Sequence, residues 1–213
     1  MKNTTLYFIR HGDVYNPKRI VYNRNNIPLS EEGFGQIESL AKRLKDWGVV
    51  PTAIYTSPLR RALQSAEKIS QVYAGTQVVQ KDNLQDTNAR ALEGKPMDWL
   101  ISIGGDIYSN PETRLLVEKP KLVAKRILAV VKEIRKKHRG ETVFIVGHGD
   151  PLAFSLWRLL HPEGKLPSIV ELGKSDYLKK GEARKFVFDE AGRVLENELF
   201  ARDESLVKGE REY

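Results

Sequence analysis

The stretch TLYFIRHGDVYN, residues 5–16, contains the strand that decides the fold and the side chains that first suggest a function. Residues 5–10 are mostly apolar, with β-branched and aromatic side chains among them, which predicts a buried strand. The strand ends directly in the sequence RHGD, Arg10–Asp13. A cation, an imidazole, a glycine and a carboxylate in succession indicate either a solvated turn or a site that handles phosphate.

Length and composition restrict the class of protein. The chain has 213 residues, of which 40% are hydrophobic and 30% charged, enough for one domain with a substantial core. No apolar run approaches the roughly 20 residues of a membrane-spanning helix. The chain has no cysteine, which excludes disulfides and thiolate chemistry and fits a cytoplasmic protein. Cleavage of a signal peptide would remove His11, so we expect none.

The charge of the chain is positive, with 35 lysines and arginines against 28 acidic residues and a net charge of +7. The basic residues are dispersed over predicted helices, opposite the apolar positions, which is typical of solvated helix faces. No motif of alternating aromatic and basic residues indicates RNA binding. We therefore expect neither a nucleic acid nor a membrane partner, and the charge favours small anionic ligands.

Strands and helices alternate along the chain. Strands are predicted at residues 5–10, 51–56, 76–79 and 142–146, and helices at 30–47, 58–75, 121–138 and from 151 onward. Residues 184–188 and 194–200 flank a turn at 189–192 and predict a hairpin. The fold class is therefore α/β: a three-layer α/β/α sandwich with a mostly parallel central sheet and an antiparallel C-terminal addition.

We predict a single domain over residues 1–213 with one irregular insertion. Residues 82–120 lack clean periodicity and contain several glycines and prolines, so they predict loops with a short helix or two. Long irregular segments in compact domains tend to be functional, and this one is expected to cover the site. Its Trp99, Tyr108 and Arg114 are candidates for substrate contact or for simple packing.

Two strands end in the same triplet. His11-Gly12-Asp13 follows the first strand, and His148-Gly149-Asp150 follows the strand at 142–146. Ligands bind at the carboxyl ends of strands in open α/β sheets, so both histidines would meet there if the strands are parallel neighbours. The glycines would let backbone N–H groups approach an anion, and the following helix would direct its positive end to it.

The other two histidines, His138 and His161, lie at predicted helix ends and are expected to be structural. A metal site would need a third histidine or a carboxylate pair at the usual spacing, and neither is present. Asp13 and Asp150 leave a metallohydrolase as a weaker alternative. We expect no metal and no other cofactor.

Four motifs recur in an order that resembles a known family: RHG at 10–12, PLSEEG at 28–33, TSPLRRALQSAE at 56–67 and VGHGD at 146–150. Over about residues 5–160 the chain resembles the histidine phosphatase superfamily, in its phosphoglycerate-mutase-like branch. The resemblance implies that His11 is a nucleophile that forms a phosphohistidine.

The same resemblance assigns the residues around the phosphate. Arg10, Arg61 and His148 would bind the phosphoryl oxygens, while Arg60 occupies a free position of the family pattern. Further phosphate contacts are implied for three residues: Asn16, Arg24 and Gly149.

The general acid is less clear, because the family usually has a glutamate where this chain has Asp86. Asp86 can perform the same proton transfer but its side chain is shorter by one methylene. Glu93 and Asp150 stay open as alternatives, in that order.

The leading functional hypothesis is a metal-independent phosphatase of a small phosphorylated metabolite. The Asn-Glu-Arg-His-Tyr-Gly run that mutases of the family typically carry is missing, yet a phosphoglycerate-mutase-type transfer stays open. A third hypothesis is a non-catalytic protein that binds a phosphorylated ligand, because Asp86 and Arg90 depart from the family pattern. The sequence identifies neither the substrate nor the oligomeric state.

Overall fold

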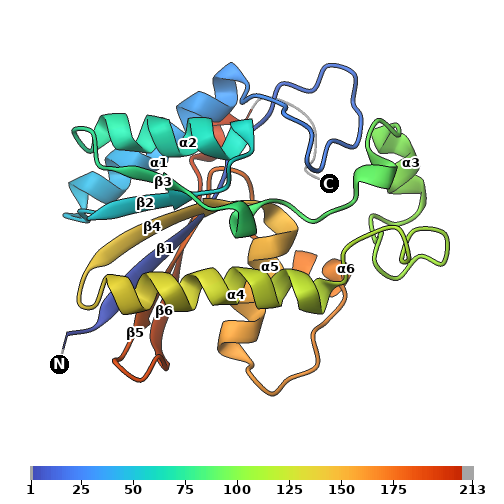
Figure 1. The fold of residues 1–213 in the computed structure, drawn as a ribbon. Coiled ribbons are helices and arrows are strands. Elements are labelled where there is room, and N and C mark those ends of the chain that lie inside the picture. Colours follow the sequence, from blue (N-terminus) through green and yellow to red (C-terminus); the bar gives the residue numbers. More distant parts are fainter. Residues whose placement is uncertain (1, 208–213) are drawn as a thin grey trace.

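A six-stranded sheet forms the centre of the computed structural model, which describes residues 2–207 (Figure 1). Met1 and residues 208–213 of the predicted single domain lie outside the described residues. The strand order is β3-β2-β4-β1-β5-β6. The bounds are β1 Thr4–Arg10, β2 Ala53–Thr56, β3 Val78–Gln80, β4 Thr142–Gly147, β5 Ala183–Phe188 and β6 Val194–Phe200.

Four strands of the sheet are parallel and two are antiparallel. β1 pairs in parallel with β4, which pairs in parallel with β2, and β2 with β3. β5 runs antiparallel to β1, and β6 antiparallel to β5. The mostly parallel sheet with an antiparallel C-terminal addition is thereby confirmed.

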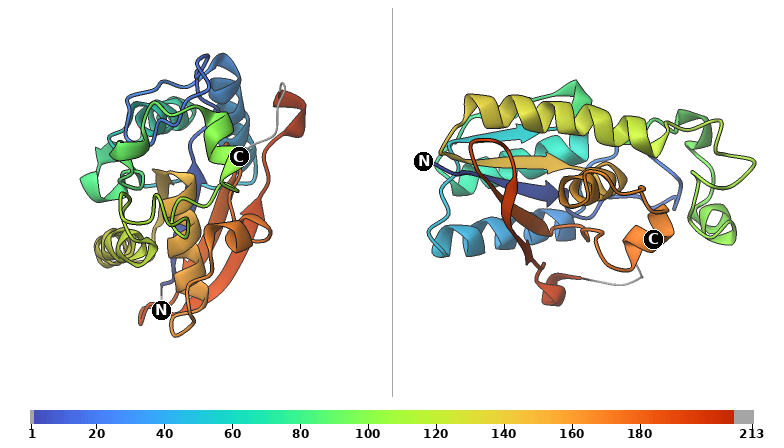
Figure 2. Two further views of the ribbon diagram at one scale, coloured as in Figure 1. Left: turned by 90° about the vertical axis from the view of Figure 1, so that its right-hand side faces the viewer. Right: turned by 90° about the horizontal axis from the view of Figure 1, so that it is seen from below.

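Helices cover both faces of the sheet. One face carries α1 (Glu31–Asp46) and α2 (Arg60–Val72), and the other carries α4 (Pro120–Lys137) and α5 (Gly149–Leu160) (Figures 1 and 2). Side chains alternate between the two faces along β1, as the period of a strand requires. Leu6 and Phe8 pack in the cluster under α4 and α5, while Tyr7 and Ile9 pack under α1 and α2. The result is the predicted three-layer sandwich.

The helices begin close to the predicted positions. Ser30 caps α1, its Oγ accepting a hydrogen bond from the Gly33 N–H at 3.0 Å. α5 begins at Gly149, earlier than predicted from Pro151. Proline is tolerated there because the N–H groups of a first turn have no partner within the helix.

The third strand starts later than the predicted range of 76–79. The chain leaves α2 through Ala74 and Gly75, whose φ angles of 55° and 86° turn the backbone. Pairing with β2 then begins at Val78, opposite Ile54, and extends to Gln80. Thr76 and Gln77, which the prediction had placed in the strand, therefore lie before it, and Gly75 belongs to the turn and not to the predicted helix.

The irregular segment lies beyond the carboxyl ends of the parallel strands (Figures 1 and 2). It contains two 3₁₀ turns, Asp82–Leu84 and Arg90–Leu92, and helix α3 (Met97–Ser102). A small apolar cluster holds it, formed by Val21, Ala89, Leu92, Ile107 and Val117. The short helix α6 (Ile169–Gly173), which the sequence did not predict, lies at the same end of the sheet. Among residues 2–207, no helix is both long and apolar enough to cross a membrane.

Candidate active site

His11 and His148 lie together at the carboxyl ends of the neighbouring strands β1 and β4. The register pairs Arg10 with Gly147, and the His11 N–H donates to the Gly147 carbonyl at 3.1 Å. The imidazole centroids are 5.3 Å apart, with the rings inclined at 61°. The sheet thus brings together the two histidines of the repeated triplet.

The hydrogen bonds of His11 define its tautomer. Its Nδ1 lies 2.7 Å from the Gly12 carbonyl oxygen, which can only accept, so Nδ1 carries the proton. Its Nε2 accepts a hydrogen bond from Arg61 Nε at 3.2 Å, and therefore presents a lone pair. Burial and then the charges of Arg61 and Arg10 lower the His11 pKa well below its ordinary value. The imidazole is neutral and suited to nucleophilic attack.

Arg61 is fully buried in the first turn of α2 and joins several parts of the site. Its Nη2 donates to Asp86 Oδ2 at 2.7 Å, and its guanidinium also donates to the carbonyls of Asn23 and Asn25. The neighbouring Arg60 is exposed. The structure therefore separates the two adjacent arginines into one interior and one surface cation, in the order that the family pattern implied.

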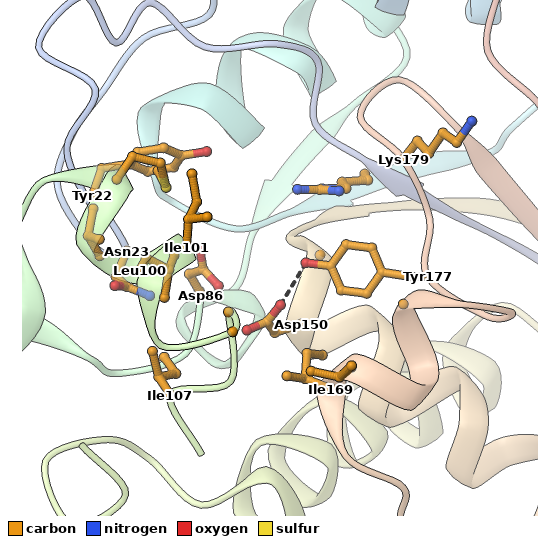
Figure 3. A pocket seen from close by; sticks show the side chains of 18 of the residues that line it. Tyr22, Asn23, Asp86, Leu100, Ile101, Ile107, Asp150, Ile169, Tyr177 and Lys179 are labelled. Atoms are coloured by element: carbon orange, nitrogen blue, oxygen red, sulfur yellow. Dashed lines mark hydrogen bonds between the residues drawn. The ribbon is translucent and has the colours of Figure 1, made fainter. Parts of the chain in front are cut away.

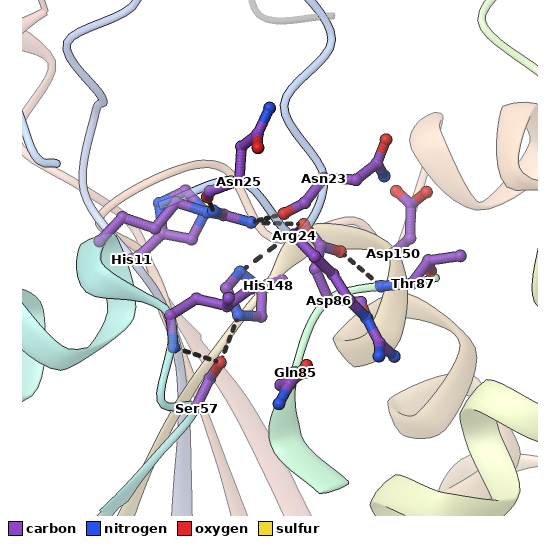
Figure 4. A network of polar contacts seen from close by, with 12 residues as sticks. His11, Asn23, Arg24, Asn25, Ser57, Gln85, Asp86, Thr87, His148 and Asp150 are labelled. Atoms are coloured by element: carbon purple, nitrogen blue, oxygen red, sulfur yellow. Dashed lines mark hydrogen bonds and ion pairs between the residues drawn. The ribbon is translucent and has the colours of Figure 1, made fainter. Parts of the chain in front are cut away.

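His148 is fully buried and has one occupied and one open nitrogen. Its Nε2 lies 2.8 Å from Ser57 Oγ, while Nδ1 has no hydrogen-bond partner among the described residues and lies 3.7 Å from Asp86 Oδ2 (Figure 4). Burial and then the charge of Arg61 lower the His148 pKa well below its ordinary value, so the ring is neutral. Ser57 can donate its hydroxyl hydrogen to Nε2, a pairing that leaves Nδ1 as a donor for an anion.

Asp86 is the carboxylate that contacts these groups. Its Oδ2 faces Arg61 and His148, and its Oδ1 accepts the Thr87 N–H at 2.9 Å. Burial raises the Asp86 pKa, and Asp150 adds to this, while Arg61 opposes it; the net shift is upward. A carboxyl group with a raised pKa next to a nucleophile is suited to proton transfer.

Two arginines fix the backbone that carries Asp86. Arg126 on α4 donates to the carbonyls of Asn83, Gln85 and Asp86 at 2.7–3.0 Å. Arg24 Nε donates to the same Asp86 carbonyl at 3.0 Å. The sequence had placed Arg24 on the phosphate and had assigned nothing to Arg126, because neither tether is visible from spacing along the chain. Both position the segment of the candidate acid.

Two further sequence candidates make hydrogen bonds to backbone groups of the loops around the site. The Asn16 amide donates to the Ile20 carbonyl at 2.9 Å and so closes its own loop. Glu93, the alternative acid, accepts the backbone N–H of Arg24 at 2.7 Å. Both side chains therefore make contacts within the loops around the site, as does the Arg24 guanidinium.

Asp150 is held by two tyrosines. Its carboxylate accepts the hydroxyl of Tyr108 at 2.5 Å and that of Tyr177 at 2.6 Å, and Figure 3 shows the second of these bonds. Burial, and then the charge of Asp150, raises the pKa of both hydroxyls well above the ordinary value, so they stay protonated and donate. Tyr177 also explains why position 149 is a glycine, because a Cβ at Gly149 would lie 2.1 Å from the tyrosine oxygen.

Arg10 approaches the site from the end of β1. Its Nη1 donates to the Leu178 carbonyl at 2.9 Å, and its guanidinium lies over the Tyr177 ring, 5.0 Å from the centroid. These contacts hold the cation beside His11 and the N-terminus of α5. Tyr177 had no signal in the sequence, since it lies in an irregular stretch after α6.

Gly12 and Asp13 both make structural contacts. For Gly12 the sequence predicted instead that its backbone N–H would approach an anion. The Gly12 N–H donates to Ser65 Oγ at 3.3 Å, and a Cβ at Gly12 would lie 2.3 Å from the Gly33 carbonyl oxygen. The glycine therefore allows α1 to pack closely. Although burial acts to raise it, Lys180 holds the Asp13 pKa below its ordinary value through an ion pair of 2.9 Å.

A cavity of about 810 Å³ lies at the candidate site. Of the sequence candidates, the lining includes Arg10, His11, Asp86, Gly149 and Asp150. Arg61 and His148 are fully buried behind them. Tyr108 reaches the site only through Asp150 and Thr87, Trp99 packs against the small apolar cluster, and Arg114 is exposed.

The described residues contain no cluster of three or more histidine or carboxylate side chains arranged to hold a metal ion. What the site does offer is a neutral imidazole lone pair, two buried arginines, an open imidazole nitrogen and a carboxyl group of raised pKa. That combination is suited to phosphoryl transfer by paired histidines.

Comparison with known proteins identifies the family. The model of the histidine phosphatase superfamily (branch 1) matches residues 6–173, and the chain belongs to this superfamily. A Hydrogenobacter thermophilus protein named "Putative phosphoserine phosphatase 2" is 28% identical over 196 residues, covering 79% of this chain and 95% of its own. "Probable phosphoglycerate mutase GpmB" of Yersinia pestis is 27% identical over 220 residues, covering 93% and 97%. The structure of Bacillus stearothermophilus YhfR superposes with a TM-score of 0.74 and 28% identity, covering 90% of this chain and 94% of that one.

Proposed function

We propose that the protein is a phosphomonoesterase that transfers the phosphoryl group of a small phosphorylated metabolite to His11 and then to water. The observation that carries the proposal is the state of His11, which is buried, neutral and protonated on Nδ1, with its Nε2 lone pair beside Arg61. A protein that only binds a phosphorylated ligand has no need for such a nucleophile.

In the first step, His11 Nε2 attacks phosphorus and the bond from phosphorus to the ester oxygen breaks. Arg61, Arg10 and the Nδ1–H of His148 stabilise the charge on the phosphoryl oxygens, with the N-terminus of α5. Asp86, in its protonated form, donates a proton to the leaving alcohol. The products are the free alcohol, a phosphohistidine and an ionised Asp86.

In the second step, the ionised Asp86 removes a proton from a water molecule, which attacks the phosphohistidine. The phosphorus–nitrogen bond breaks, inorganic phosphate leaves, and Asp86 is protonated again. Arg10 and Arg61 supply the positive charge throughout, so we expect the activity to be independent of a metal. A cytoplasmic location stays a prediction from the cysteine-free composition.

The test is hydrolysis of p-nitrophenyl phosphate in excess EDTA. Wild-type protein and a His161→Ala control, altered at an exposed histidine at the opposite end of α5 from Gly149, should release p-nitrophenol. His11→Ala should be inactive. Full activity of His11→Ala would overturn the proposal, and loss of activity in EDTA that added metal restores would overturn metal independence.

Phosphoglycerate mutase activity is the second candidate, because one relative carries that name. Incubation with 3-phosphoglycerate labelled on its phosphate separates the two. Label recovered as inorganic phosphate supports the phosphatase, whereas label moved to 2-phosphoglycerate supports the mutase.

A further inference from the structure

The outer part of the cavity has apolar walls that come from two separate elements. Met97, Leu100 and Ile101 of α3, with Ile107 after it, form one wall. Ile169 and Val170 at the start of α6 form another. Figure 3 shows Leu100, Ile101 and Ile107 on one side of the Asp86 and Asp150 carboxylates, and Ile169 on the other side near Tyr177.

The apolar residues of α3 are divided between a core and the cavity. Trp99 and Leu100, with Ile103 just after the helix, pack against the small apolar cluster that holds the irregular segment. Met97 and Ile101 have no place in that cluster and line the cavity instead. None of the six residues of α3 is fully buried, and Val170 across the cavity is 43% exposed. A contiguous apolar surface that stays open to solvent marks a binding site.

Besides the site residues at its floor, the cavity is lined by Tyr22 and Asn23 and by three cations, Lys174, Lys179 and Arg202. At the floor, both oxygens of Asp150 already accept tyrosine hydroxyls, so this carboxylate is not placed to receive the ammonium group of an amino acid. On the rim, Lys179 is paired with Glu204 at 3.3 Å. The side chains that α3 and α6 themselves contribute to the lining are all apolar, while Lys174 follows α6 directly.

The size of the cavity also favours a substrate larger than a three-carbon phosphoacid. Its volume of about 810 Å³ lies in the range of roughly 300–1,000 Å³ that accommodates drug-sized ligands. A three-carbon phosphoacid such as phosphoserine or phosphoglycerate would fill only a small part of this volume and would leave the apolar walls uncovered.

We propose that the alcohol part of the substrate is an apolar body, an aryl group or an alkyl chain longer than three carbons, which lies between α3 and α6. The inference rests on the proposed function, because it takes the phosphoryl group to be bound at His11. It deepens that function by separating this chain from the activities named in its relatives, phosphoserine phosphatase and phosphoglycerate mutase.

The experiment measures kcat/KM for ethyl, butyl and hexyl phosphate, 1-naphthyl phosphate, phosphoserine and 3-phosphoglycerate. Each added methylene should raise kcat/KM roughly fourfold, the factor expected for burial of one methylene group. Hexyl and naphthyl phosphate should exceed both phosphoacids by at least roughly tenfold on the same basis.

Variants of the α3 wall test whether the preference for longer alkyl chains arises there. Met97→Gln, which nearly preserves side-chain volume, and Ile101→Asn should each reduce the ratio of hexyl to ethyl phosphate turnover. Leu115→Asn is the matched control, since Leu115 is 83% exposed in the same irregular segment and does not line the cavity. Thermal unfolding of each variant verifies that it is folded.

The outcomes separate the two proposals. A flat or reversed dependence on chain length, or higher kcat/KM for phosphoserine or 3-phosphoglycerate, overturns the apolar substrate class and leaves the phosphatase intact. Absence of turnover for every ester overturns the proposed function itself.

Discussion

Arg61 Nε and His11 Nε2 lie 3.2 Å apart, within hydrogen-bonding distance, in the interior of the protein. The contact joins the first turn of α2 to the end of β1. It places a permanent cation against the one nitrogen of His11 that can attack phosphorus, and so helps to keep that nitrogen unprotonated. The same guanidinium holds the carboxylate of Asp86 at 2.7 Å, so one side chain organises both the candidate nucleophile and the candidate acid.

The paired arginines give a matched test of this relationship. Arg61→Ala should lower kcat/KM for p-nitrophenyl phosphate by roughly 10²–10³-fold, because the variant loses a preorganised donor to the transition state. Arg60→Ala removes the adjacent exposed cation and should change kcat/KM less than twofold, by the small effect of surface substitutions. Similar losses in steady-state kinetics of the two variants would contradict the assignment.

Asp86 and Glu93 can be distinguished by the leaving group. Asp86→Asn should lower kcat/KM for alkyl phosphates by roughly 10²–10⁴-fold, the usual contribution of general acid catalysis. The loss should be smaller for p-nitrophenyl phosphate, whose leaving group needs little protonation. Glu93→Gln should show no such dependence on the leaving group, since Glu93 only accepts a backbone N–H. A steeper leaving-group dependence in Glu93→Gln would assign the acid to that residue.

Stability should fall as the solution becomes acidic, because two buried histidines are neutral in the folded protein. Burial holds the pKa of His11 and His148 well below the ordinary value of 6.5, so the unfolded chain binds more protons below that pH. Stability from the neutral rings is therefore present above about pH 6.5 and is lost as the pH falls, by up to about 1.4 kcal/mol per pH unit for each group.

Urea unfolding at a series of pH values from 7.5 to 5.5 measures this loss. His148→Gln should show a shallower decline than the wild type, because one of the two rings is gone. Equal slopes for the two proteins would mean that His148 titrates normally in the folded state.

Two glycines of the same region should respond to alanine in opposite ways. Gly12→Ala should destabilise the protein by about 1–3 kcal/mol or more, because the new Cβ would lie 2.3 Å from the Gly33 carbonyl oxygen. Gly35→Ala in α1, where a Cβ meets nothing within 4 Å, should stabilise it by about 0.5–1 kcal/mol. Thermal or urea unfolding measures both, and a stable Gly12→Ala protein would refute the close approach.

The sequence predicted the layers of the fold well, because the signals for them are local. Apolar strands and amphipathic helices alternate along the chain, and Ser30 is a recognisable cap. The repeated His-Gly-Asp triplet predicted the meeting of His11 and His148, since parallel strands end at the same edge. The predicted ends of some elements were wrong. β3 begins at Val78, where its pairing with β2 starts, and α5 begins at Gly149, where the geometry of the first turn sets the start of the helix.

The irregular segments account for most of what the sequence could not predict. Arg24, predicted to contact the phosphate, also holds the Asp86 backbone, and Arg126 does the same from α4 without any motif. Tyr177 and the helix α6 follow no periodic pattern. Contacts of this kind join residues far apart in the chain, so neither propensity nor spacing reveals them.

The central claim is that His11 carries the phosphoryl group, and direct detection of the phosphoenzyme tests it. Asp86→Asn should slow hydrolysis of the intermediate more than its formation from p-nitrophenyl phosphate, so the intermediate should accumulate. Alkaline quenching followed by peptide mass spectrometry should then find one phosphoryl group on His11, stable in alkali and lost in acid. A phosphoryl group on another residue, or a burst of p-nitrophenol with no phosphorylated His11, would contradict the account.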